Sequence, residues 1–139
     1  MADSLPAVPL AVVPEATVST EAARAALPAE VPHTDAAFTA ARAAVLGAAL
    51  ASGSEELFAA ALDDRLHEPY RAANAPLLAT VRARLPAGAL GATLSGSGPT
   101  VIVWAREGEA KTCAEELAGR HADAQILPLA VATTGAGVA

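Results

Sequence analysis

Along the 139-residue chain, short continuous apolar runs occur before and after segments in which apolar residues recur at helical spacing. An apolar, β-branched run closed by a proline at residues 8–14 predicts a buried strand. Apolar residues then recur at helical spacing and predict helices over 19–27, 34–53, 54–64 and 74–86. The pattern changes toward the C-terminal end, where we expect a helix over 108–121 and strands over 89–95, 100–105 and 125–132.

Local signals assign the ends and the faces of these helices. Ser19 or Thr20 suits the N-cap of the first helix, Thr34 that of the second, and Gly53 the C-cap of the second. In the helix over 74–86, Asn74 is the expected cap. The spacing in that helix separates an inward set from an outward pair, namely Leu78, Val81 and Leu85 from Arg82 and Arg84.

The order of the expected elements indicates a fold. With the helices between the first two strands reduced to one, the order is strand, helix, strand, strand, helix, strand. This is the split β-α-β-β-α-β order of a ferredoxin-like fold, an α+β sandwich in which helices cover one face of a four-stranded antiparallel sheet. Pro128 favours an edge position for the last strand, and the apolar run at 101–104 favours a central position for the third. We expect a single domain over 1–139.

Composition excludes several classes of function. The net charge is −6 and no basic stripe stands out, so we expect no nucleic acid partner. No apolar run approaches the length of a membrane span, and the N-terminal segment does not have the pattern of a signal peptide, so we expect a cytoplasmic protein. The single cysteine, Cys113, reads as a small buried hydrophobe. The three histidines lack metal-ligand spacing, and we expect this chain to hold no metal.

A glycine-rich loop, SGSGPT at 95–100, connects two of the expected strands. It allows two interpretations. Glycines at positive φ and serines are routine in a hairpin turn. The same residues would let backbone N–H groups converge on an anion. The loop is neither a Walker A sequence nor a dinucleotide-binding GxGxxG.

Two charged segments are the other candidates for a site. The segment 62–71, LDDRLHEPYR, is either a solvated helix end or the border of a site. Pro69 disfavours continued helix at Glu68, so Tyr70 and Arg71 would belong to a loop. His67 reads as a packing or capping histidine. Arg24 either faces solvent or turns inward, where its planar fork would suit a carboxylate.

Together these segments resemble the C-terminal half of homoserine kinases, a family of the GHMP kinase superfamily. The resemblance rests on VSTEAARAALP at 18–28, DDRLHEPYR at 63–71, GATLSGSGPTVIV at 91–103 and TTGAGV at 133–138, although Gly137 stands where an arginine is more usual. It implies transfer of the γ-phosphoryl group of ATP, with Mg²⁺, to the hydroxyl of L-homoserine in threonine biosynthesis. It also implies that Arg24, Arg71 and Gly96 bind the substrate. The loop formed by Ser95, Gly96, Ser97, Gly98, Pro99 and Thr100 would lie near the phosphates.

The superfamily's ATP loop has no counterpart here, because the first glycine is Gly47, inside an expected helix. We therefore hypothesise an acceptor-side domain that needs an N-terminal kinase half, in cis or in trans. Alone, it would be inactive and would not bind ATP or Mg²⁺ tightly. The face that this half would cover favours self-association, so a homo-oligomer is expected. The residues do not indicate a catalytic group. Two alternatives remain, a non-catalytic amino-acid-binding module and an interaction domain.

Overall fold

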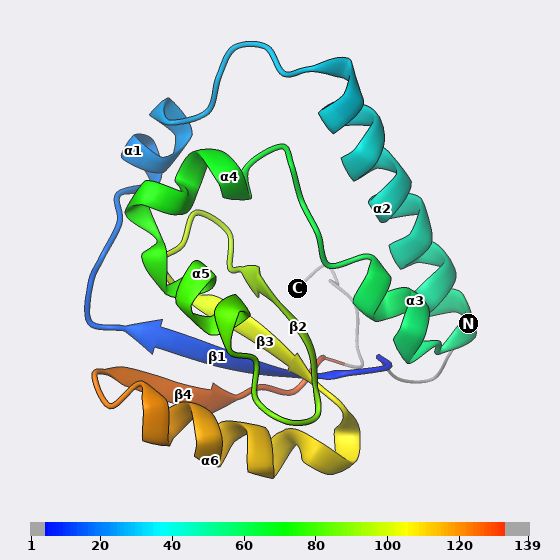
Figure 1. Cartoon of the computed structure of the whole chain (residues 1–139), viewed down its shortest axis with the longest axis vertical. Helices are drawn as coiled ribbons and strands as arrows, with labels where there is room; N and C mark the ends of the chain where they lie inside the picture. Colours follow the sequence, from blue (N-terminus) through cyan, green and yellow to red (C-terminus); the bar gives the residue numbers. More distant parts are fainter. Residues whose placement is uncertain (1–4, 133–139) are drawn as a thin grey trace, which may run out of the picture.

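The computed structural model describes residues 5–132 and contains one antiparallel sheet of four strands in the order β2-β3-β1-β4 (Figure 1). The strands are β1 (Val8–Pro14), β2 (Ala89–Leu94), β3 (Val101–Ala105) and β4 (Ala124–Pro128). The first strand is central, because β1 pairs with β3 on one side and with β4 on the other. This order confirms the α+β, ferredoxin-like prediction, with β3 inside the sheet and β4 at an edge.

The helices are α1 (Thr20–Ala25), α2 (His33–Ser52), α3 (Glu55–Ala60), α4 (Glu68–Arg71), α5 (Pro76–Ala83) and α6 (Ala110–Arg120), with 3-10 turns at Ala72–Asn74 and Glu107–Glu109. The side chain of Ser19 accepts a hydrogen bond from the Ala22 N–H and caps α1, as expected. Gly53 ends α2 in the left-handed conformation, with φ of 70°, and so confirms the predicted C-cap.

Several local predictions are wrong. Pro32, not Thr34, precedes α2, and Asn74 lies in a 3-10 turn before α5 rather than at its cap. Pro69 does not interrupt a helix but lies in the first turn of α4, where its missing N–H is not needed. Leu85 is 37% exposed and follows the end of α5, so it does not face inward as Leu78 and Val81 do.

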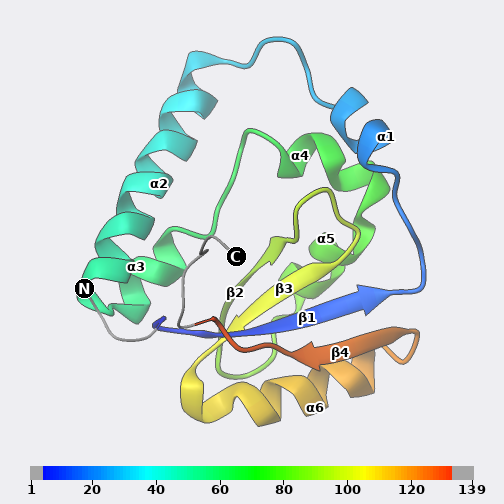
Figure 2. The ribbon, with the colours of Figure 1, turned by 180° about the vertical axis from the view of Figure 1, so that it is seen from behind.

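Helices pack on both faces of the sheet. On one face, α5 and α6 enclose the main core, which includes Leu10, Val12, Val101, Val103, Cys113 and Leu117. On the other face, α2 and α3 pack at one end through a smaller cluster around Phe58 and Trp104, whose rings meet edge to face at 5.2 Å. In both views α2 stands apart from the sheet as an outer arm (Figures 1 and 2). The expectation of helices on one face alone therefore missed the position of α2 and α3.

The inner face of the arm holds the segment that leads to α4. The guanidinium groups of Arg42 and Arg65 each lie over the Phe38 ring, at 4.7 and 3.9 Å from its centre. Arg65 also pairs with Asp35 at 3.3 Å, and Arg42 donates to the Ala60 carbonyl at 2.7 Å. These contacts fix where the chain leaves α3, and therefore where α4 begins.

Candidate functional site

The glycine loop connects β2 to β3 as a hairpin. The Ser95 N–H donates to the Thr100 carbonyl and the Gly98 N–H donates to the Ser95 carbonyl, each at 2.9 Å. Gly96 and Gly98 have φ of 56° and 80°, which a residue with a side chain rarely adopts. Within residues 5–132, the N–H groups of Gly96 and Ser97 have no hydrogen-bond partner. The loop is thus a turn, as one interpretation held, and two of its adjacent donors are free, as the other requires.

Arg71 reaches this loop from the last position of α4. Its Nη1 donates to the Gly96 carbonyl at 2.6 Å. The side chain is half-buried, and its Nε is buried without a hydrogen-bond partner in the described part of the chain. The structure thus brings together two of the three residues that the resemblance assigned to substrate binding.

The third, Arg24, stands on the exposed side of α1. Its side chain forms no hydrogen bond or ion pair with any residue in the range 5–132. Both views draw α1 beside the carboxyl end of α4 (Figures 1 and 2). Its role as a substrate ligand stays a prediction.

Asp64 organises the start of α4. Its carboxylate accepts hydrogen bonds from the N–H groups of Leu66, His67 and Glu68, the last two at 2.8 Å. Burial alone would raise the pKa of Asp64. The backbone hydrogen bonds from Glu68, His67 and Leu66, with the nearby His67 charge, outweigh this effect and hold the pKa below its ordinary value. Asp64 is therefore a structural cap rather than a solvated acid.

His67 is held beside this cap. Its Nε2 lies 3.8 Å from the Asp64 carboxylate, and the side chain is 40% exposed. His67 occupies the residue before α4, but its side chain makes no capping hydrogen bond there. The interpretation as a packing residue fits better than the interpretation as a cap.

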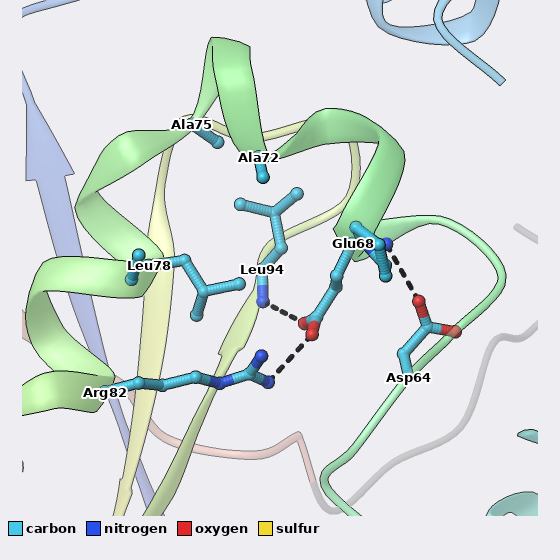
Figure 3. Close-up of a pocket in the computed structure, with 9 residues that line it drawn as sticks. Asp64, Glu68, Ala72, Ala75, Leu78, Arg82 and Leu94 are labelled. Carbon is cyan, nitrogen blue, oxygen red and sulfur yellow. Dashed lines mark hydrogen bonds and ion pairs between the residues drawn. The ribbon is translucent and has the colours of Figure 1, made fainter.

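The sequence missed a buried ion pair between α4 and α5 (Figure 3). Glu68 is 5% exposed, and its Oε1 accepts a hydrogen bond from the Leu94 N–H at 2.8 Å. Its Oε2 lies 2.8 Å from Nη2 of Arg82 and forms an ion pair there, although it accepts no well-directed hydrogen bond. Arg82 also donates to the carbonyl groups of Ala92 and Leu62. The expectation that Arg82 points outward is wrong, because its guanidinium turns sideways to the sheet edge.

Two cavities lie around this pair. One, of about 220 Å³, is bounded by α4, α5 and the end of β2 and is mostly apolar (Figure 3). The other, of about 400 Å³, lies between α2, the segment 61–68 and the second sheet face. Asp64, Glu68 and Leu94 line both cavities. Neither of these two cavities is lined by Arg24, Arg71 or the loop 95–100.

In the part of the chain that the structure describes, no group of three or more His, Cys, Asp or Glu side chains is arranged to hold a metal ion. Over the same residues, no helix has both the length and the apolar character needed to cross a membrane. Burial raises the pKa of the Cys113 thiol, and the charges of Glu116 and Glu109 raise it further. The thiol donates to the Ala87 carbonyl at 2.8 Å.

The sheet order and the glycine hairpin define an α+β domain of the ferredoxin-like kind, in which an arginine meets the loop at one end of the sheet. Residues 46–123 match the family model described as the C-terminal domain of GHMP kinases, and the chain belongs to this family.

Homoserine kinases are among the proteins that this chain is similar to. The homoserine kinase of Streptomyces avermitilis is 45% identical over 128 residues, which cover 92% of this chain and 41% of that protein. The homoserine kinase of Gloeobacter violaceus is 52% identical over 91 residues, 65% of this chain and 30% of that protein. The chain therefore spans well under half the length of these relatives.

Solved structures agree on the fold. A homoserine kinase from Cytophaga hutchinsonii superposes with a TM-score of 0.78 at 23% identity, covering 89% of this chain and 41% of that one. A putative homoserine kinase from Listeria monocytogenes gives a TM-score of 0.65 at 26% identity, covering 95% and 44%.

Proposed function

We propose that this chain supplies the acceptor-binding part of a homoserine kinase, an enzyme that transfers the γ-phosphoryl group of ATP to the hydroxyl of L-homoserine. The contact between Arg71 and the Gly96 carbonyl carries the proposal. It sets a guanidinium group beside a loop with two free N–H donors, at a place where a small anionic molecule can reach both. The similarity to homoserine kinases supports L-homoserine as this molecule.

Arginine suits the carboxylate of an amino acid. The guanidinium group carries five N–H donors in a planar fork. In Arg71 one of them holds Gly96, and the outer Nη groups remain for the carboxylate. A charge-assisted hydrogen bond of this kind contributes roughly 1.5–3 kcal/mol. Arg24 would add a second guanidinium group from α1.

The loop would lie against the phosphates, where the N–H groups of Gly96 and Ser97 favour negative charge. Phosphoryl transfer depends mainly on positioning and on electrostatic stabilisation, so an orienting clamp contributes directly to the rate. When bound, ATP supplies the phosphoryl group and Mg²⁺ neutralises its charge. Within the described range, no three His, Cys, Asp or Glu side chains are grouped so that they could hold a metal ion.

ATP and Mg²⁺ would therefore be held by an N-terminal kinase half, joined to this domain or supplied as a separate chain. Alone, this chain would be inactive and would not bind ATP tightly. Under this proposal the protein acts in the cytoplasm in threonine biosynthesis. The face that meets the kinase half would favour a homo-oligomer when uncovered.

The test uses the enzyme that this chain forms with its kinase half and measures the KM for L-homoserine and for ATP. Arg71→Ala should raise the KM for homoserine about 10- to 100-fold, the equivalent of one lost charge-assisted hydrogen bond. Arg71→Lys should recover little, because a point charge lacks the fork. The KM for ATP should not change.

Arg84→Ala is the matched control, because Arg84 is exposed and is not part of the site. An Arg71→Lys enzyme with the parent's KM for homoserine would refute the clamp. Titration of this chain with ATP and Mg²⁺ gives an independent check, since tight binding would contradict the need for a second half. Binding of homoserine without any phosphorylation in the presence of the kinase half would favour a non-catalytic module.

A further inference from the structure

We propose that Glu68 is a positioning residue that holds Arg71 in register with the glycine loop. The inference rests on the proposed function, because the residue that Glu68 places is the substrate clamp. Glu68 itself pairs with Arg82 and with the Leu94 N–H, and it acts through Arg71.

The first argument is the shortness of α4. The helix has four residues, with Glu68 first and Arg71 last. Residues three apart on a helix lie on the same side. Glu68 binds the Leu94 N–H at 2.8 Å, and Arg71 binds the Gly96 carbonyl at 2.6 Å. One side of a single helical turn therefore contacts the chain at the residues on either side of Ser95.

The second argument is the free edge of β2. Within residues 5–132 this strand pairs only with β3, so alternate backbone groups of β2 point away from the sheet. Glu68 takes the Leu94 N–H and Arg82 takes the Ala92 carbonyl at 2.9 Å. Because the two side chains also pair with each other at 2.8 Å, α4, α5 and the strand that enters the loop are joined at one point (Figure 3).

The third argument is how Glu68 is held. Its side chain is 4% exposed, so its carboxylate has almost no contact with water. A cavity of about 220 Å³ lies directly beside it. The direction of the carboxylate is therefore set by its polar partners rather than by close packing, and a change of charge at this position would release α4.

The test separates positioning from plain structural support. In the enzyme formed with the kinase half, Glu68→Gln should raise the KM for L-homoserine on the order of tenfold, because small displacements of a clamp have large effects. The KM for ATP should stay at the parent value. In an Arg71→Ala background, Glu68→Gln should raise the KM no further, because the residue that it places is gone.

A KM unchanged by Glu68→Gln, or a rise by the same factor in both backgrounds, would overturn the inference. If Arg71→Ala alone left the KM unchanged, the proposed function would fail first, and that result is distinct. Glu55→Gln is the matched control, because Glu55 pairs with Arg106 at 3.0 Å on the surface, away from the loop. If Glu68→Gln does not fold, Arg82→Lys keeps the charge opposite Glu68 but loses the fork, and the same pattern of KM values is expected.

A second measurement needs no activity. In ¹H–¹⁵N spectra of the 139-residue chain, Glu68→Gln should shift the Gly96 amide and the Arg71 side-chain signal, and Glu55→Gln should shift neither. Signals of Gly96 and Arg71 that coincide with those of the parent would overturn the inference.

Discussion

Removal of Arg82 tests the energetics of the site most directly. Arg82→Met keeps much of the volume and length of the side chain but leaves the carboxylate of Glu68, 4% exposed, without its counter-ion. Breaking a buried pair by removing one partner costs about 3–5 kcal/mol. The cavity beside the pair has about 220 Å³, enough to admit water to the carboxylate, so we expect the lower end, about 3 kcal/mol.

Removal of the charge of Glu68 should lower the free energy of unfolding less than removal of Arg82. In Glu68→Gln the amide oxygen still accepts from the Leu94 N–H, and Arg82, whose side chain is 33% exposed, can turn toward water. We expect a loss of about 1–2 kcal/mol. The double variant should be more stable than the sum of the two single losses implies, because it leaves no unpaired charge.

The chain offers a matched control. Arg106 pairs with Glu55 at 3.0 Å, nearly the same separation, but both side chains are about half exposed. Arg106→Met should cost about 1 kcal/mol or less. Urea unfolding, followed by far-UV circular dichroism and by the fluorescence of the single tryptophan, Trp104, gives the free energy of unfolding of the parent and of each of the four variants. The reasoning is refuted if Arg82→Met costs no more than Arg106→Met.

Three further predictions follow from local geometry. Gly98→Ala should be more destabilising than Gly96→Ala, because both have positive φ but only at Gly98 would a Cβ meet Leu94, at 3.0 Å; equal urea midpoints would contradict this. Because the pKa of Asp64 is lowered in the folded state, its contribution to stability is present at neutral pH and is lost as the pH falls below 3.8 and through the lowered pKa. Unfolding free energies of Asp64→Asn, measured from about pH 7 to about pH 3, should therefore fall less steeply in acid than those of the parent. Parallel profiles would count against the cap. The buried thiol of Cys113, with its raised pKa, should react with a thiol reagent only on unfolding, and fast labelling of the native protein would disprove this.

The fold was accessible from the sequence because its strands are short apolar runs between turn residues. Pro128 and the ferredoxin-like order together predicted an edge position for β4, and the structure confirms it. The helix ends were less accessible. Pro69 disfavours helix for the residue before it but is tolerated in a first turn, and the sequence does not say which of these effects applies. The hydrogen bond from the Leu94 N–H at the sheet edge to the side chain of Glu68 favours the helical conformation there.

The buried ion pair of Glu68 and Arg82 could not be predicted from the sequence, for a different reason. The helical pattern separates an apolar stripe from a polar face, and Arg82 falls on the polar side. A long side chain at the margin of the stripe can bend back along it, and the groups that Arg82 binds come from β2 and from the segment after α3. Only the family resemblance assigned both Arg71 and Gly96 to one site, since the residues themselves left both a solvated end and a site open; their direct contact was not predicted.

The central place of β1 also governs the order in which the protein can acquire its structure. Within residues 5–132, β1 pairs with β3 and β4, which lie far from it in the sequence, as Val12 with Val101 and Leu10 with Pro128. These strands must therefore be present before the centre of the sheet can form, and contacts so distant in sequence make folding slow. The helices between β1 and β2 lie in the connection that this pairing closes, so truncation before β3 should leave β1 without either partner strand.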